Sequence, residues 1–514
     1  TGLPPWDPRF DAAIKTRPHS DQVFKAPTRG WVQSGNIVSA PTDQAEVLDN
    51  IFPTAQSGRL RGGCSVHADI GDPIVRLFAY SSGPSEVLFA ATATDIWDTS
   101  SLGAAALASQ TSGDWSVTQI VTAGGSFLVG VNGVDTGWTF NGSTFSALSL
   151  TGIAEEDVSQ IWLYKERLFF IEKGTMSAWY LPVKSIGGTA VEIPLGSVFR
   201  RGGSLLFGAT WSLDTGSNIA DACIFVTTNG EIAVYQGNDP SSSSTWALSG
   251  VYDIGKPIDK HAFFKAGGDL AIMTSDGIVP VSAALRKDRA ALQADAITFP
   301  IEDAWANVIA QRTTEYPITA TLWQSQTMLL VGVPGKNIAY VANARTGAWC
   351  RYTGWDVRCA AVADDQLYFG TNDGLVMKAE SGGNDNGVAY TGAYVPKFSQ
   401  CGYAGIKVAN HGIVTIRSNS GNNFVLSAHS DYQVGTVTPS SALVSTDSSV
   451  WGTGVWGTFI WGGSNSLDVS TIARTVSAEG YSLSLGVYVT SNQTIRPFFE
   501  ILATRLRFEN ATAI

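Results

Sequence analysis

The sequence has few of the residues that build catalytic or metal centres. Only 15% of its 514 residues are charged, and it contains five histidines, five cysteines and four methionines. No histidine stands two or four positions from another, which argues against a zinc site of the usual kind. Because the five cysteines are an odd number and widely spaced, we expect reduced, mostly buried thiols and no disulfide framework.

The sequence also lacks long apolar runs and any excess of basic residues. No run approaches the roughly 18 to 20 apolar residues that cross a bilayer, so we expect no membrane-spanning segment. The first residues contain no signal-peptide core, so secretion has no support. The net charge of −11 argues against a protein that grips nucleic acid by counterion release. It is compatible with a surface past which DNA must slide.

Glycine and aromatic residues are abundant. The chain contains 54 glycines, and 11% of its residues are aromatic. This composition is typical of many short strands joined by tight turns, so the chain should be mostly β. Its length exceeds the size at which one hydrophobic core stops growing, which predicts either one large repeat array or two to three domains.

A repeated hairpin pattern organises the middle of the chain. Apolar runs flank Asn229-Gly230 and Asp276-Gly277, and such Asx-Gly pairs are strong hairpin signals because both residues tolerate positive φ. Seven apolar strands recur at roughly 40 to 57 residues, a period typical of four-stranded propeller blades. They centre on Leu88-Phe89, Phe127 to Val129, Leu168 to Phe170, Ile224 to Val226, Leu270 to Ile272, Met328 to Leu330 and Leu367 to Phe369.

The prediction is therefore an all-β chain with three parts. Residues 1–58 are rich in proline and should form an extended N-terminal arm that lies on other surfaces. Residues 59–380 should form a β-propeller of seven or eight blades, with a helical excursion over 282–294 and 301–311. Residues 381–514 have longer alternating strands, over 388–394, 407–417, 424–429, 481–490 and 498–508, and should form a β-sandwich-like platform domain. A stack of unrelated sandwiches is the alternative.

Two groups of residues are candidates for contacts with another subunit. Trp451, Trp456 and Trp461 recur every five residues beside glycines, a spacing that fits neither strand nor helix well. They either fill a core or form an aromatic anchor for a neighbouring subunit. Arg286 and Arg289 stand beside the helical excursion, where they could contact a neighbour or a channel.

A catalytic interpretation has weak support. Ser212, Asp214 and Gly216 match the start of the Asp-box turn of sialidase-like propellers, but the pattern fails at Asn218 and Ile219. That motif stabilises a turn and is not itself catalytic. We therefore predict no enzyme, with no catalytic, cofactor-binding or metal-binding residues and no cofactor. The alternative is a carbohydrate-binding or sialidase-like propeller that acts on host-surface glycans.

Several phrases, in their order along the chain, resemble bacteriophage tail proteins of the nozzle or tail-hub (tail tubular) class. They lie at residues 202–216, 251–255, 267–270, 277–280, 346–349, 368–370 and 384–387 and in the Trp-Gly series, and the resemblance covers the chain from about residue 60 onward. It implies a structural virion protein in which a β-propeller joins a platform domain and six copies form a ring that closes the tail.

The same resemblance implies the partners and the location. DNA would pass through the lumen of the homo-oligomer without sequence-specific binding, and the ring would contact a head-to-tail adaptor protein and tail fibres. The protein would be assembled in the bacterial host cytoplasm and reside in the virion tail. A plain host-cell scaffold remains a further alternative.

Overall fold

The computed structural model describes residues 19–83, 85–214, 219–313, 317–333, 335–419, 423–443 and 468–511. Strands account for 52% of the structure and helices for 6%. The prediction of a mostly β chain is confirmed.

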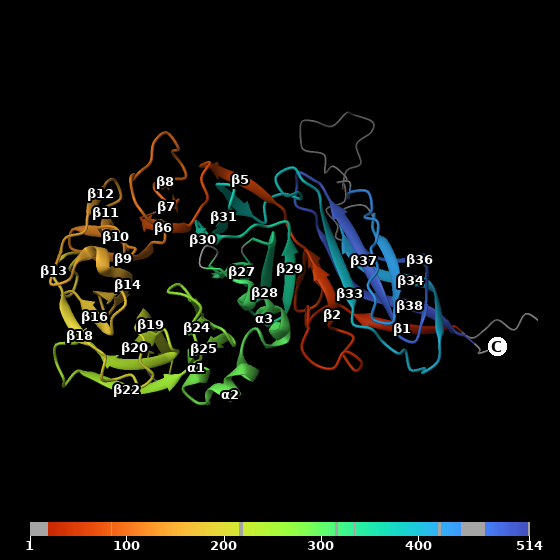
Figure 1. Cartoon of the computed structure of the whole chain (residues 1–514). Coiled ribbons are helices and arrows are strands. Elements are labelled where there is room, and N and C mark those ends of the chain that lie inside the picture. The colour runs from red at the N-terminus through yellow and green to blue at the C-terminus, as the bar shows by residue number, and fades with distance from the viewer. Residues whose placement is uncertain are drawn as a thin grey trace, which may run out of the picture.

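Seven small antiparallel sheets follow one another along the described part of residues 64–379 and lie in a ring (Figure 1). In six of these sheets the strands pair in chain order, as local hairpins, and the last sheet also takes in one strand from the beginning of the ring. The sheets of the first half are β6 (Arg76–Ser82), β7 (Ser85–Ala91) and β8 (Ile96–Asp98); β9 (Ser116–Thr122), β10 (Gly125–Val131), β11 (Trp138–Phe140) and β12 (Phe145–Ala147); and β14 (Val158–Tyr164), β15 (Arg167–Glu172), β16 (Ser177–Tyr180) and β18 (Val191–Pro194). A short parallel pair, β13 (Leu150–Thr151) with β17 (Gly188–Thr189), lies beside them.

The remaining sheets of the ring have the same organisation. They are β19 (Leu205–Asp214), β20 (Ile219–Thr227), β21 (Glu231–Gly237) and β22 (Trp246–Asp253); β23 (Phe263–Ala266), β24 (Asp269–Thr274) and β25 (Gly277–Pro280); β26 (Thr319–Trp323), β27 (Met328–Val333), β28 (Ile338–Asn343) and β29 (Trp349–Thr353); and β30 (Cys359–Ala363), β31 (Gln366–Gly370) and β32 (Leu375–Ala379) with β5 (Cys64–Asp69). The seven apolar strands predicted from the sequence are β7, β10, β15, β20, β24, β27 and β31, which are the second strands of these sheets.

The ring closes through strands from its two ends. β5 precedes all the other ring strands in sequence, yet it pairs with β32 and completes the last sheet. First strands pack against the first strands of neighbouring sheets, as β9 does against β14, and β30 contacts β6. A ring of small sheets stacked face to face and closed by its N-terminal strand is a β-propeller.

Aromatic side chains fill the space between neighbouring sheets. Trp138 in β11 is buried against Phe78 of the preceding sheet, with ring centroids 5.6 Å apart. The indole lies so close to its own sheet that a Cβ at Gly130 would come within 2.3 Å of it. Trp162 of β14 lies equally close to a glycine of the next sheet, since a Cβ at Gly208 in β19 would come within 2.3 Å of its indole. The glycines therefore allow the large rings to lie between sheets.

The helical excursion follows β25 but is more broken than predicted. In place of one helix over 282–294 there are α1 (Val281–Ala284), α2 (Arg289–Leu292) and a 3-10 turn (Gln293–Asp295). Between α1 and α2, Leu285 still packs against the core, but the charged residues 286–288 that follow are exposed, so no apolar contact holds them in one continuous helix. The second helix, α3 (Glu302–Gln311), forms where it was predicted and buries Ala304, Trp305 and Val308. No helix in the described residues is long and apolar enough to cross a membrane.

The C-terminal part contains two sheets whose apolar faces share one core. Its strands are β33 (Tyr390–Pro396), β34 (Lys407–Ser418), β35 (Val425–Ser430), β36 (Asp468–Gly480), β37 (Leu483–Ser491) and β38 (Phe499–Asn510). One sheet has the order β3-β4-β38-β34-β36, and β1 also pairs with β38. The other contains β33, β37 and β35. The strand β36 was not among the predicted strands.

The proline-rich arm supplies strands to these sheets from residue 20 onward. It contains β1 (Ser20–Lys25), β2 (Ala45–Asp49) and β3 (Ile51–Pro53), followed by β4 (Gly58–Leu60). β2 lies between β29 of the propeller and β33 of the C-terminal part, so eight strands form one sheet in the order β26-β27-β28-β29-β2-β33-β37-β35. The arm thus joins the two parts through backbone hydrogen bonds.

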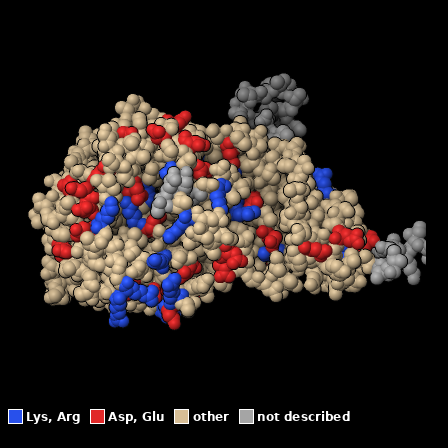
Figure 2. All heavy atoms as spheres, viewed as in Figure 1, with Lys and Arg blue, Asp and Glu red and all other residues tan. Residues whose placement is uncertain are grey.

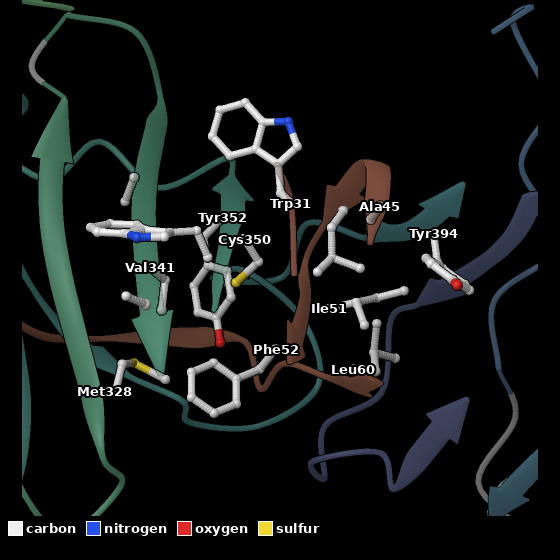
Figure 3. Close-up of a cluster of buried hydrophobic side chains, with 14 of the residues drawn as sticks. Trp31, Ala45, Ile51, Phe52, Leu60, Met328, Val341, Cys350, Tyr352 and Tyr394 are labelled. Atoms are coloured by element: carbon white, nitrogen blue, oxygen red, sulfur yellow. The ribbon is translucent and has the colours of Figure 1, made fainter. Parts of the chain in front are cut away.

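A large apolar core lies where the arm, the propeller and the C-terminal part meet (Figure 3). Phe52 of β3 points toward Val341 and Tyr352 of the β26–β29 sheet, whereas Ile51 of β3 and Leu60 of β4 point to the opposite side, where both lie against Gly392 of β33. All five side chains are buried. At roughly 1.5 to 3 kcal/mol for each large apolar side chain, burial of this core favours the docked arrangement strongly.

Arg61 is fully buried beside this core. Its guanidinium donates to both carboxylate oxygens of Asp385, at 2.8 and 2.6 Å, to Asn50 Oδ1 at 2.7 Å, and to the carbonyls of Gly62 and Thr353. All five of its N–H donors are therefore used. The guanidinium also stacks on the Tyr390 ring, 3.9 Å from its centroid. We call Arg61, Asp385 and Asn50 the seam network, because they tie the arm, β29 and the C-terminal part together.

We predict that Arg61→Met lowers the free energy of unfolding by about 3 to 5 kcal/mol, because it leaves the carboxylate of Asp385 buried without its partner. The double variant Arg61→Met with Asp385→Leu should recover part of this loss. Urea denaturation measures both. The matched control is Lys184→Met, since Lys184 and Glu166 form an exposed ion pair that should contribute less than about 1 kcal/mol. Equal losses in Arg61→Met and the control would contradict the role given to the seam network.

Candidate functional site

A cluster of charged side chains crosses the middle of the propeller at one end of the ring. Asp114 precedes β9, Arg76 begins β6, and Lys260 and His261 precede β23. The cluster therefore joins three first strands whose sheets lie on different sides of the ring. We call these four residues the axial cluster. In Figure 2, Lys and Arg side chains gather around the middle of the propeller, with acidic side chains beside them.

One carboxylate holds the axial cluster together. Asp114 lies 3.1 Å from Arg76 Nη2, 3.1 Å from Lys260 Nζ and 3.0 Å from His261 Nε2. Lys260 also donates to the carbonyls of Asp114 at 2.9 Å and Asn132 at 3.3 Å. The ammonium group thus bridges two loops on the far side of the ring, and the cluster ties opposite blades together.

The electrostatics of the cluster follow from burial and from the shared carboxylate. Burial opposes ionisation of Asp114, but the His261 imidazole 3.0 Å away and the charges of Arg76 and Lys260 outweigh it and hold the pKa of Asp114 well below its usual range. Burial and the Arg76 charge lower the pKa of His261 to about 4. Burial also lowers the pKa of Lys260. At neutral pH the carboxylate is therefore charged and the imidazole is neutral.

A cavity of about 330 Å³ lies over the axial cluster. Its charged lining residues are Arg76, Lys260, Arg312, Arg358, Asp114 and Asp259. Four cations and two carboxylates give a local charge of +2, in a chain whose net charge is −11. Arg312 donates to the Ile258 carbonyl at 3.0 Å, and Arg358 donates to Asn372 Oδ1 at 3.1 Å. The described cavity wall is therefore positive.

The axial cluster contains an Asp–His pair but not a nucleophile triad. Within the described residues, no Ser, Thr or Cys side chain is hydrogen-bonded to His261. Asp114 is shared by two further cations, so it cannot serve the imidazole alone as the carboxylate of a triad does. No group of three or more His, Cys, Asp or Glu side chains in the described ranges could hold a metal ion. What the cluster can do is hold charge and tie loops together.

Arg286 and Arg289 lie on the helical excursion, away from the axial cluster. Arg289 Nε donates to Asp276 Oδ2 at 2.7 Å, in the turn between β24 and β25. Arg286 Nε donates to the Ser282 carbonyl at 3.2 Å, and its side chain is exposed. Basic side chains gather over α1 and α2 in Figure 2. The other three candidates, Trp451, Trp456 and Trp461, lie outside the described residues.

The axial residues were not identified from the sequence. Asp114, Lys260 and His261 have no motif spacing that relates them, because they meet only when the ring closes. The repeat pattern did contain one indication that these residues lie close together. Each residue stands a few positions before the first strand of a blade, and in a propeller all such positions converge on the axis.

Comparisons with known proteins leave the family open. No family model matches the chain, and no curated protein matches it. Among solved structures, similar β-propeller proteins include the extracellular domain of the putative hybrid two component system BT3049 from B. thetaiotaomicron, at 11% identity and TM-score 0.39 over 60% of this chain and 39% of that one. The chain thus spans well under half the length of that protein.

Two further propeller structures are similar over most of their own length. BBS1N in complex with ARL6DN matches at 10% identity and TM-score 0.39, over 63% of this chain and 97% of that one. Streptogramin B lyase matches at 14% identity and TM-score 0.35, over 60% and 93%. With TM-scores below 0.5, the propeller assignment rests on the sheet topology described above.

We predict that His261 makes the protein less stable as the pH falls from about 6.5 to 4. The pKa of His261 is about 4 in the folded state against 6.5 for an ordinary histidine, so in this window the unfolded chain binds a proton that the folded chain excludes. The loss should reach about 3 kcal/mol at most. Thermal or urea unfolding of His261→Gln should show a flatter pH profile than the parent. His411→Gln, at an exposed position of β34, controls for loss of a histidine elsewhere. If the stability of the parent and of His261→Gln depends on pH in the same way, His261 is not the cause of the loss.

Proposed function

We propose that the chain is a structural subunit of a bacteriophage tail, of the nozzle or tail-hub type. In this proposal a seven-bladed propeller is fixed to a β platform, copies assemble into a ring of six, and the ring gates and conducts genomic DNA during ejection. The subunit has no enzymatic role and no cofactor. Its location is the virion tail, after assembly in the host cytoplasm.

The observation that carries the proposal is the continuous connection between the propeller and the C-terminal part. The eight-stranded sheet passes from β26 through β2 to β35 without a flexible link. Where the chain passes between the two parts, the seam network holds them together through the buried guanidinium of Arg61, whose N–H donors all have acceptors. Separate enzyme domains usually move relative to each other across smaller and more polar interfaces. A rigid two-part subunit suits a tail component, which must keep its propeller and its C-terminal part in a fixed relation while the tail is under pressure.

The C-terminal part also carries surfaces suited to neighbouring subunits. Among the large apolar side chains of the described residues, five are more than half exposed, and four of them, Val388, Val469, Tyr481 and Ile495, lie in this part. β36 is an edge strand of 13 residues that pairs only with β34 in the described structure. It carries a single basic residue, Arg474, and no proline. Long edges with so little protection are sites where another chain adds a strand.

The charge of the chain supports a role in conducting DNA. A ring of acidic subunits repels phosphate, so DNA inside it would not be retained by counterion release. The partners implied by the resemblance are other copies of the chain, a head-to-tail adaptor protein, tail fibres, and DNA without sequence-specific contacts. Trp451, Trp456 and Trp461 remain proposed interface residues, since they stand in the 24 residues that precede β36 in sequence.

We expect the purified protein to form rings with a central opening, with a mass six times that of the 54.4 kDa chain. Size-exclusion chromatography with light scattering gives the mass, and negative-stain electron microscopy shows the ring. Low salt and micromolar protein should be included, because interfaces between acidic subunits depend on ionic strength. A chain that remains monomeric under all these conditions would overturn the assembly on which the proposal depends.

We further expect Thr471→Lys with Ala473→Lys to weaken assembly about tenfold or more, because two lysines on an edge strand oppose pairing with another strand. Both residues are exposed on β36. The matched control places the same two lysines at Ser146 and Ala147, which are exposed on β12 at the edge of a blade. Concentration-dependent light scattering compares the variants. Equal assembly of both would place the interface elsewhere while leaving the ring itself intact.

A further inference from the structure

A polar groove lies between the propeller and the C-terminal part, on a different surface from the axial cluster. It encloses about 500 Å³. One wall is the β3-β4-β38-β34 sheet with its β3–β4 turn, and the other is formed by the β26–β27 and β28–β29 turns. Asn343 Nδ2 donates to the Pro53 carbonyl at 2.9 Å and holds the two walls together. Grooves between domains are common positions for ligand sites.

Three arginines line this groove. Two of them, Arg59 and Arg417, lie on either side of Glu500 across three neighbouring strands. Arg59 on β4 stands opposite Glu500 on β38, and Glu500 stands opposite Arg417 on β34. The Glu500 carboxylate pairs with Arg417, at 3.3 Å. Arg345 approaches from the β28–β29 turn. The four charged side chains give the groove a charge of +2 within an acidic protein.

Arg59 has no acceptor for its Nε–H among the described residues. The Nε atom is buried, and the guanidinium stacks on Phe52, 5.5 Å from the ring centroid. No ion pair holds Arg59 or Arg345 in the described structure, although Asp and Glu outnumber Lys and Arg in the chain. A buried donor normally finds a partner, because leaving it unpaired costs about 1 to 3 kcal/mol. An anion bound in the groove would supply the missing acceptor.

Neutral polar side chains line most of the rest of the groove, together with Phe52, Ala55 and Leu502. Gln56 and Ser57 come from the β3–β4 turn, and Gln326 and Thr327 come from the β26–β27 turn. Amide and hydroxyl groups both donate and accept, so they suit the hydroxyls of a sugar. The volume far exceeds that of a lone phosphate or carboxylate group. The lining thus matches a ligand with one charged end and several hydroxyls.

We propose that this groove binds a saccharide that carries an anionic group, either a carboxylate or a phosphate. Arg59 and Arg345 hold the oxyanion through charge-assisted hydrogen bonds, and Arg417, already paired with Glu500, adds to the positive field. The amide and hydroxyl side chains of the two turns hold the sugar body. This site goes beyond the proposed structural function and does not require assembly of six copies. If the saccharide does not bind, the proposed tail function is unaffected, and if the chain does not assemble, the binding proposal is unaffected.

The test is isothermal titration calorimetry of the full chain with glucuronate, glucose 6-phosphate, glucose and inorganic phosphate. We expect at least one anionic sugar to bind tenfold or more tightly than glucose and than inorganic phosphate. Preference for glucuronate identifies a carboxylate ligand, and preference for glucose 6-phosphate identifies a phosphate ligand. If neither anionic sugar binds better than glucose, the proposal is wrong. If inorganic phosphate alone binds as tightly as the sugars, the saccharide part is wrong.

Variants connect the binding to the groove. Arg345→Gln, in an exposed turn, should weaken binding of the preferred sugar about tenfold without affecting folding, and Arg59→Gln should do the same. Because Arg59 packs near the core, its variant is interpreted only if its circular dichroism and unfolding midpoint match the parent. Lys184→Gln, an exposed cation on the propeller, is the control and should bind as the parent does. Unchanged binding in Arg345→Gln would overturn the site.

Discussion

The buried ion pair between Arg61 and Asp385 is the interaction on which the arrangement of the whole chain depends. The chain enters the propeller just after Arg61 and leaves it just before Asp385, so the two crossing segments must lie in contact. Their backbones approach so closely that a Cβ at Gly63 would lie 1.8 Å from the Asn384 carbonyl oxygen. Glu380 closes the same crossing by accepting from the Gly62 amide and pairing with Arg496 at 2.5 Å. An isolated buried charge would be costly, but here every donor of the Arg61 guanidinium has an acceptor, so the contact between the two crossing segments is both stable and specific.

Local patterns predicted the strands whose partners are near in sequence. All seven apolar strands found from the sequence are second strands of ring sheets, because those strands are buried on both faces and are followed by clear turns. The strands that were missed pair over long distances or lie at an edge. β1 pairs with β38, more than 470 positions away, and proline interrupts the pattern around it. β36 alternates small and polar residues because one face and one edge meet solvent, which removes the apolar signal.

The sites were less predictable than the strands, for a physical reason. Arg286 and Arg289 were predicted as contact residues because they stand beside the helical excursion, and in the structure their side chains bond locally, to Ser282 and Asp276. Asp114 and His261 are single residues in separate loops, and only the closed ring brings them to 3.0 Å. The groove arginines likewise come from three separate elements. Sequence spacing carries information about neighbours on one strand or helix, whereas these groups are assembled by topology.

The axial cluster also decides where DNA could travel under the proposed function. Lys260 and Asp114 meet at 3.1 Å across the ring, so the propeller is closed at this end by a salt bridge between opposite blades. A duplex whose major groove alone is about 12 Å wide cannot pass such a contact. The conduit must then be the space enclosed by several copies, and its width is set by how the rigid subunits contact one another. A subunit with a hinge between propeller and platform would leave that width undefined. The seam network leaves no hinge between the two parts, so in the proposed ring contacts at the platform edge would fix the position of every propeller around the lumen.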